Sequence, residues 1–409
     1  MLVAYFCFLT FFITVHGYHD PILNHVPNSP RPYQLIDEDQ ILLSQVVWKH
    51  GEREPLYSLR NSTNHDDAWP SSNASLTEFG VVQQYELGKL LNNMYINTSR
   101  PLLTSHNPEE VYIQSFDLNR TIASARANLL GMFGDEGTKI PINVVDKHED
   151  YLLNFFMYCA RVCDIYQVIG IDDKVLKFQN DIKNFTHFLQ EKIHRYVGIG
   201  GTYLLLDEHN FEKQYNISEP DWMTEEVVAN MTNISRFLWR YYHGVEVPSP
   251  ELVRLRGGPL LTTMIDNMNR KIKCTSCRHL SNCNQISELK YQAYSSHGTT
   301  IYALLNTLGL KEDLFTGVMP DYTASIAVEL WNLKHGGPSV RVLYHSGYHS
   351  DYQVITHLIS GCPIDSEFCA LKTFERRSRP FMVKDIEKEC QSQNRNQSER
   401  SKNDLCDKL

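Results

Sequence analysis

Three parts of the chain share one pattern, in which an apolar run typical of a buried strand is followed by an amphipathic helix. The predicted strands cover residues 41–48, 111–115 and 291–295, and the helices cover residues 76–95, 120–133 and 299–310. Strands that alternate with helices favour parallel pairing. Residues 325–345 instead have the pattern of a hairpin that turns at Gly336 and Gly337. The sequence therefore predicts an α/β fold with a mixed, mostly parallel sheet flanked by helices.

A long middle segment, residues 149–247, lacks strand alternation and carries several helical periods. We predict a helical insertion or cap domain there, which divides the α/β core into residues 18–148 and 248–390. The last residues, 391–409, are polar, and a segment of this composition is expected to be disordered.

The N-terminus and the sequons indicate the secretory pathway, with a secreted or lysosomal destination. Residues 2–15 form an uncharged apolar run too short to span a bilayer comfortably, and Gly17 suits a cleavage point. Residues 1–17 are therefore predicted to be a signal peptide; the alternative is a buried N-terminal strand. No other segment has the length of a transmembrane helix, so no membrane anchor is expected. Glycosylation is predicted at Asn61, Asn73, Asn97, Asn184, Asn216, Asn230, Asn233 and Asn396, and a further sequon begins at Asn119.

The cysteines fit an oxidising compartment. Nine of the ten remain after removal of the leader that contains Cys7, so at least one is free or bonds another chain. One cluster could be a zinc site, although such a compartment favours disulfides over thiolate ligands. That cluster consists of Cys274, Cys277, His279 and Cys283.

Basic and titratable side chains follow all three predicted parallel strands. Ligands of open α/β sheets bind beyond the carboxyl ends of the strands. Those ends supply Lys49, His50 and Arg53, then Arg120, and then His297. Each alone is more often a solvated side chain, but their repetition indicates one site. A net charge of −9 leaves no basic surplus for nucleic acid, so the sequence predicts a local pocket for an oxyanion the size of a phosphoryl group.

The motifs around these residues resemble those of the histidine acid phosphatases, which include the prostatic and lysosomal enzymes. The family signature Arg-His-Gly-x-Arg-x-Pro is similar to "KHGEREP" here, and Arg-Ser-Thr-Asp-x-Asp-Arg-Thr is similar to "QSFDLNRT". The segments "LTEFGVVQQYELG", "LRGGPLL" and "HGTT" also resemble family motifs. The resemblance runs from about residue 41 to residue 390. It implies a phosphoglycerate mutase-like core and acid phosphatase activity on phosphate monoesters.

The resemblance implies a role for each residue of the pocket. His50 would attack phosphorus and form a phosphohistidine, which water then hydrolyses. Lys49, Arg53 and Arg120 would bind the phosphoryl oxygens, and His297 would hydrogen-bond one of them. These cations take the role of a metal, so neither a metal nor another cofactor is expected. The implied partner is a small-molecule or protein phosphate monoester. A homodimer is compatible with the resemblance.

The resemblance also implies disulfides. Cys362 is expected to bond Cys369, and Cys390 is expected to bond either Cys159 or Cys163. The cysteine cluster near residue 274 looks like a local replacement for a family bridge.

Several positions depart from the family pattern. The family uses an aspartate after the second histidine as general acid, but Gly298 stands there. Loss of a general acid lowers a rate by about 10² to 10⁴, most for an alkyl leaving group. Lys49 stands in place of an arginine, and Gln114, Phe116 and Asn119 also differ from the motif. Two functions therefore remain open: a slowed acid phosphatase, or a non-catalytic secreted protein that binds phosphate esters or another secreted partner.

Overall fold

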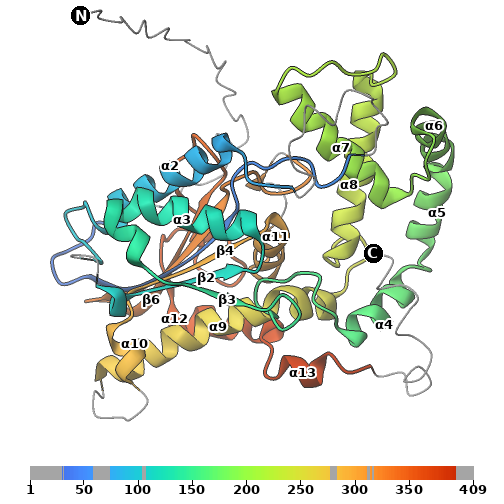
Figure 1. Ribbon diagram of the computed structural model, residues 1–409. Helices are drawn as coiled ribbons and strands as arrows, with labels where there is room; N and C mark the ends of the chain where they lie inside the picture. Colours follow the sequence, from blue (N-terminus) through green and yellow to red (C-terminus); the bar gives the residue numbers. More distant parts are fainter. Residues whose placement is uncertain are drawn as a thin grey trace, which may run out of the picture.

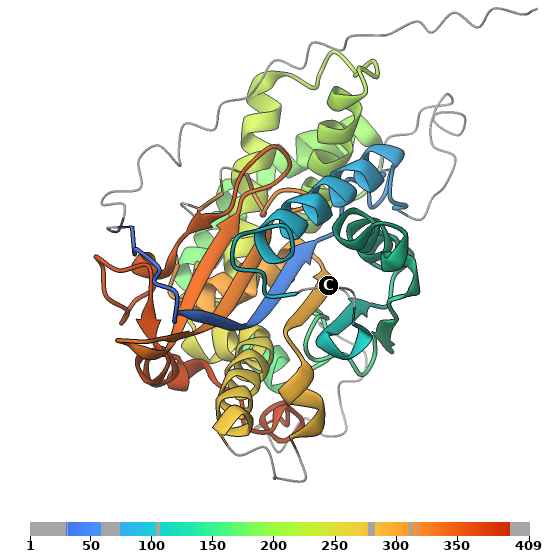
Figure 2. The ribbon, with the colours of Figure 1, turned by 90° about the vertical axis from the view of Figure 1, so that its left-hand side faces the viewer.

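The computed structural model describes residue 30 and residues 32–58, 74–103, 107–276, 283–310, 314–315 and 317–392. One mixed sheet lies at the centre of the larger part of the molecule, with helices on both of its faces (Figure 1). A view turned by 90° shows the twist of this sheet (Figure 2). The α/β fold and the mixed sheet with a parallel core are confirmed.

The sheet has eight strands in the order β3-β2-β4-β1-β5-β6-β7, and β8 pairs with β6. Neighbours among β3, β2, β4 and β1 are parallel, whereas β5 to β8 run antiparallel to their neighbours. The predicted hairpin is the β5–β6 pair. The bounds are β1 Gln40–Lys49, β2 Val111–Phe116, β3 Ile142–Val145, β4 Tyr291–Ser296, β5 Ser325–Leu333, β6 Gly337–His345, β7 Gln353–Val354 and β8 Cys369–Ala370.

Strand β1 buries both of its faces, which explains its continuous apolar run. Val46 and Trp48 belong to an apolar cluster with helices α2 (Glu78–Tyr95) and α3 (Asn119–Phe133). Leu43 and Val47 point to the opposite face. They join a second cluster with α9 (Pro250–Ser276), α11 (Gly298–Thr307) and α12 (Leu371–Ser378). The short helices outside the middle segment of the chain are η2 Pro108–Glu110, η3 Gly134–Lys139, α10 Asn284–Glu288, η5 Thr356–Leu358, η6 Arg379–Phe381 and α13 Ile386–Glu389.

Helix ends follow local sequence signals. Helix α2 begins where the Thr77 hydroxyl accepts a hydrogen bond from the backbone N–H of Gly80 at 2.9 Å. Helix α11 ends at Thr307, three residues before the predicted end at residue 310. The reason is Gly309, whose φ of +74° is incompatible with a continued right-handed helix.

The middle of the chain folds into helices. They are α4 Ala160–Ile169, α5 Asp173–Asp181, α6 Lys183–Ile193, α7 Ile199–Gln214 and α8 Glu225–Tyr242. Helices α5 to α8 lie beside the sheet (Figure 1). Helices α6, α7 and α8 share a small apolar core that includes Leu189, Leu205 and Met231, whereas α4 packs into the main core through Val162 and Ile165.

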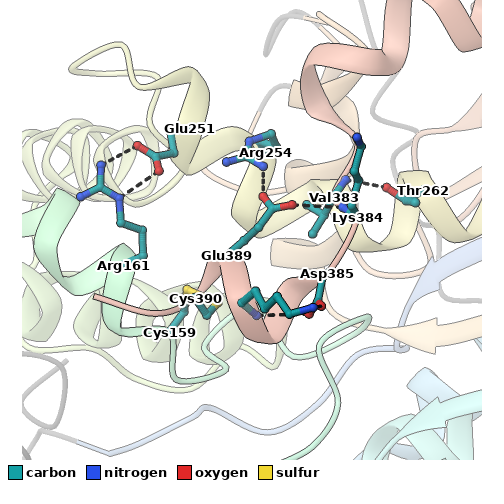
Figure 3. Close-up of polar contacts among 11 residues, drawn as sticks. Cys159, Arg161, Glu251, Arg254, Thr262, Val383, Lys384, Asp385, Glu389 and Cys390 are labelled. Atoms are coloured by element: carbon teal, nitrogen blue, oxygen red, sulfur yellow. Dashed lines mark hydrogen bonds and ion pairs between the residues drawn. A yellow bond between two sulfur atoms is a disulfide. The ribbon is translucent and has the colours of Figure 1, made fainter. Parts of the chain in front are cut away.

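The C-terminal segment is fastened to α9 and α4 (Figure 3). Cys390 forms a disulfide with Cys159, which is one of the two partners that the sequence left open. Arg161 binds Glu251 through two hydrogen bonds of 2.9 and 2.7 Å, and Arg254 forms an ion pair with Glu389. The start of the helical segment, the long helix α9 and the end of the described chain are therefore held together.

Two further disulfides are local. Cys362 bonds Cys369, and Cys274 bonds Cys283. The second bridge uses two of the four side chains that could have formed a zinc site, so zinc binding by that cluster is not supported. Cys277 and His279 lie outside the described residues, as do the predicted signal peptide and most of the polar tail.

The sequons that can be described lie on the surface. The side chains of Asn97, Asn184, Asn216, Asn230 and Asn233 are exposed. Asn61, Asn73 and Asn396 lie outside the described residues. Within the described part of the chain, no helix is both long enough and apolar enough to cross a membrane.

Candidate active site

The register of the parallel strands brings the predicted residues together. Lys49 at the end of β1 is paired with Ser296 at the end of β4, and Ser115 of β2 is paired with Ser295 of β4. The backbone N–H of His50 extends this ladder and donates to the Ser296 carbonyl at 3.0 Å. The segments that follow these three strands therefore begin at one edge of the sheet.

Helices α2 and α3 fix the loop after β1. The side chain of Gln84 donates to the Lys49 carbonyl at 2.8 Å, and that of Gln83 accepts from the Glu52 N–H at 2.8 Å. A Cβ on Gly51 would lie 2.1 Å from the Gly80 carbonyl oxygen, so only glycine permits this approach of loop and helix. The motif "LTEFGVVQQ" thus positions "KHGER" rather than contacting a ligand itself.

His50 is buried, with 3% of its surface exposed, and is held as one tautomer. Its Nδ1 lies 2.7 Å from the Gly51 carbonyl oxygen, which can only accept, so Nδ1 carries the proton and Nε2 the lone pair. Burial lowers the pKa of His50 well below its usual value, and the nearby His297 and Arg120 lower it further. The rings of His50 and His297 are 5.4 Å apart at an angle of 77°. His50 is therefore a neutral imidazole suited to nucleophilic attack.

The arginines form the cationic side of the site. Arg53 is buried, and the Nε atoms of Arg53 and Arg120 have no hydrogen-bond partner among the described residues. Burial lowers the pKa of Arg120 to about 10, and the charge of Arg53 acts in the same direction. Two buried guanidinium N–H groups without partners indicate a site for an anion, because such groups are unfavourable unless they are satisfied.

His297 and Gly298 lie where β4 meets α11. His297 precedes the first residue of α11, and the ring of Phe116 lies edge-on to it at 4.9 Å. Burial and the three cations Arg120, Arg53 and Lys49 hold the pKa of His297 well below its usual value. Gly298 is the first residue of the helix and does not have a positive φ, so its backbone suits any residue type.

Three further side chains enter the site that the sequence did not indicate. Asp207 of α7 binds Arg53 at 2.9 and 3.0 Å. Tyr322, in the loop before β5, lies 5.8 Å from the His50 ring and 4.2 Å below the Lys49 ammonium. Tyr203 of α7 lies near enough to Arg53 and Arg120 for their charges to lower its pKa, although burial raises that pKa overall. No motif marks these residues, because they come from the helical segment and from a loop.

A comparison with protein families matches residues 40–345 to the histidine phosphatase superfamily (branch 2). The chain belongs to this family. The match includes both histidines, the three cations and all strands from β1 to β6. Within the described residues, no group of three or more histidine, cysteine, aspartate or glutamate side chains could hold a metal ion.

Individual relatives agree with the histidine phosphatase assignment. The chain is 25% identical to the lysosomal acid phosphatase of Xenopus laevis over 88% of its own length and 80% of that protein. It is 27% identical to the human prostatic acid phosphatase, over 86% of this chain and 88% of that one. Among solved structures, Hafnia alvei phytase with myo-inositol hexakis sulphate matches with a TM-score of 0.62, at 15% identity, over 88% of this chain and 100% of that one. At that identity the structural match speaks for the fold alone.

Proposed function

We infer that the protein hydrolyses phosphate monoesters through a phosphohistidine formed at His50. The observation that carries this proposal is the tautomer of His50, whose Nδ1–H is bound by the Gly51 carbonyl 2.7 Å away. Nε2 is left with its lone pair, and the lowered pKa of His50 keeps that lone pair available in mildly acidic solution.

The cations supply the electrostatic part of the reaction. Arg53 and Arg120 would each direct a buried Nε–H at the phosphoryl oxygens, and Lys49 adds a third positive charge. His297 would donate a hydrogen bond to a further oxygen. Fixed positive charge of this kind stabilises the transition state of phosphoryl transfer, so the reaction needs no metal.

The reaction would proceed in two steps. In the first, Nε2 of His50 bonds to phosphorus while the alcohol leaves. In the second, water attacks the phosphohistidine and releases inorganic phosphate. The buried site favours this sequence because the charged intermediate is surrounded by fixed cations rather than by mobile water.

A second candidate function is the binding of phosphate esters without turnover. Gly298 favours it, because the family places its general acid at that position and glycine has no proton to give. The buried neutral His50 favours the enzyme, since a binding site needs cations but not a nucleophile.

We further propose that the protein enters the secretory pathway and acts in the lysosome or outside the cell. Residues 1–17 would be a signal peptide, and residues 149–247 a cap over the core. The disulfide between Cys159 and Cys390, the two local disulfides and the exposed sequons support an oxidising compartment. The relative whose name places it in the lysosome supports the same conclusion.

The test is to trap the intermediate. Purified protein would be mixed with an aryl phosphate labelled on phosphorus and quenched in alkali, in which phosphohistidine survives. We expect label on His50 and none in His50→Ala, whereas His187→Ala, a change at an exposed histidine of α6, should behave like the natural protein. Phosphate binding without label on any histidine would instead establish the non-catalytic function.

A further inference from the structure

We propose that Lys49 donates the proton to the leaving group, in place of the carboxylic acid that the family pattern puts at position 298. This inference rests on the proposed function and concerns the same site. Lys49 would then bind phosphate and also protonate the leaving group, a step that Gly298 cannot perform.

The Lys49 side chain fills the space beside Gly298. Its Cδ lies 3.3 Å from the point where a Cβ on residue 298 would stand, and the Pro320 carbonyl oxygen lies 3.4 Å from the same point. The Lys49 Nζ donates to that carbonyl oxygen at 3.0 Å. The ammonium group and a carboxyl group at position 298 would therefore share one small region next to the histidines.

The surroundings of Lys49 favour loss of its proton. The groups that face it are Arg53, His50 and His297 from the core, Asp207 from α7, and Asp321 and Tyr322 from the loop before β5. Burial lowers the pKa of Lys49 to about 8; the charge of Arg53 acts in the same direction, and those of Asp321 and Asp207 oppose it. A lysine can transfer a proton under such conditions, whereas the family's arginine cannot.

Other described groups near His50 are poorer donors. Asp207 accepts N–H bonds from two nitrogens of Arg53 and from Leu56, so both of its carboxylate oxygens are already engaged as acceptors. The pKa of Tyr322 is raised to about 12 by burial. Asp321 is exposed, its Cβ lies 3.0 Å from the position of a Cβ on Gly347, and its charge acts on Lys49.

The step balances without any other reactant. Nε2 of His50 bonds to phosphorus as the bond from phosphorus to the ester oxygen breaks, and a proton moves from Lys49 Nζ to that oxygen. The products are the alcohol, the phosphohistidine and a neutral lysine. When water attacks phosphorus, the lysine takes a proton from it, and the electrons of the phosphorus–nitrogen bond return to His50. The net reaction is hydrolysis of the ester.

The proposal predicts a particular pH profile. A lysine donor stays protonated until the pH rises through its folded-state pKa of about 8, so cleavage of an alkyl ester should decline only above that pH. The release of nitrophenolate needs little protonation and should not show this decline.

Lys49→Arg separates proton donation from charge, because arginine keeps the positive charge but does not titrate in this range. Single-turnover phosphorylation of His50 would be followed by rapid quench with nitrophenyl phosphate and with a glycerol phosphate. We expect the rate with glycerol phosphate to fall by roughly 10² or more relative to the rate with nitrophenyl phosphate, with the decline near pH 8 abolished. Lys89→Arg, at an exposed position of α2, is the matched control.

A second measurement does not depend on activity. Sulfate, which keeps two negative charges across the range, should raise the melting temperature of the natural protein less at pH 9 than at pH 7. In Lys49→Arg the rise should be nearly the same at both, because Arg120, with a pKa of about 10, is still largely charged at pH 9. Equal sulfate stabilisation of the natural protein at the two pH values would overturn the proposal.

The outcomes distinguish this inference from the proposed function. Suppose that the natural protein forms phosphohistidine and that Lys49→Arg is phosphorylated by glycerol phosphate at the same rate. Lys49 is then not the proton donor, and the proposed function stands. If the natural protein forms no phosphohistidine with either ester, the proposed function fails and this inference fails with it.

Discussion

Asp207 binds both terminal nitrogens of Arg53, so helix α7 completes the charge arrangement of the loop that follows β1. The distances are 2.9 Å to Nη1 and 3.0 Å to Nη2, and the N–H of Leu56 donates to the same carboxylate at 2.8 Å. Arg53 and Asp207 are only 6% and 11% exposed. Helix α7 therefore contributes a side chain to the candidate site.

Removal of this carboxylate should destabilise the protein and make its stability depend on phosphate. Asp207→Ala leaves a buried guanidinium without its partner, which costs about 3–5 kcal/mol. Added phosphate should recover part of this loss, because it can satisfy the same N–H groups. Urea unfolding with and without phosphate measures both effects.

The partly exposed pair of Arg161 and Glu251 provides the control (Figure 3). Glu251→Ala should lower the free energy of unfolding by no more than about 1 kcal/mol, with no response to phosphate. Losses of the same size in the two variants would show that Arg53 does not depend on Asp207.

The sequence predicted the parts of the site that follow periodic strands. His50, Arg120 and His297 could be grouped because apolar runs mark the ends of β1, β2 and β4, and parallel pairing brings those ends together. Asp207 could not be found, because α7 has no motif and its orientation depends on tertiary packing. The proximity of Lys49 to Gly298 was also hidden. The sequence shows that Lys49 and Gly298 each depart from the family pattern. Only the fold shows that the Lys49 side chain fills the space beside Gly298.

Glycans are expected at the exposed sequons of the helical segment but not at Asn119. Asn119 is the first residue of α3 and precedes Arg120, so a glycan there would stand over the anion site. The hydroxyl of Thr121, which completes that sequon, is buried and donates to the carbonyls of Phe116 and Leu118 at 2.7 and 2.8 Å. Glycopeptide mapping should find Asn184, Asn216, Asn230 or Asn233 occupied and Asn119 unmodified. An occupied Asn119 would contradict the placement of Arg120 in a phosphate pocket.

The bridge between Cys159 and Cys390 should stabilise the fold more than the local bridges do. It joins residues 231 apart in sequence, against 7 for Cys362 and Cys369, and a longer loop restricts the unfolded chain more. Replacing both cysteines of the long bridge by serine should lower the free energy of unfolding by about 2–5 kcal/mol. The same change at Cys362 and Cys369 should have the smaller effect in a thermal melt, and the reverse order would contradict this reasoning.

Mild acid should destabilise the ligand-free protein. Burial lowers the pKa of His345 to about 4 and holds the pKa values of His50 and His297 well below the ordinary range. Below about pH 6.5 the unfolded chain therefore binds more protons than the native one. The free energy of unfolding should then fall as the pH falls, by up to about 1.4 kcal/mol per pH unit for each such histidine.

Urea titrations between pH 7 and 4.5 measure this slope. His345→Gln should make the slope shallower, since it removes one histidine with a lowered pKa. His187→Gln should leave the slope unchanged because that side chain is exposed. A stability that is constant or rises toward pH 4.5 would show that these histidines are not neutral in the native state.

Restoring the family residues at positions 49 and 298 tests whether they act as a pair. An aspartate at position 298 fits, because the atom nearest to its Cβ is the flexible Lys49 Cδ at 3.3 Å, while Met319 Cε and the Pro320 carbonyl oxygen lie at an ordinary contact distance of 3.4 Å. Carboxylates are also favoured in the first turn of a helix. With Lys49 present, Gly298→Asp should raise alkyl phosphate turnover only slightly, since a donor is already there and the new carboxylate would pair with it. In the Lys49→Arg background the same change should raise alkyl turnover by roughly 10², and nitrophenyl phosphate turnover much less.

The natural protein, the two single variants and the double variant form a double-mutant cycle. The effects of residues that share one task are strongly non-additive in such a cycle. Additive effects, with equal gains in both backgrounds, would mean that Lys49 and position 298 do not supply the same proton.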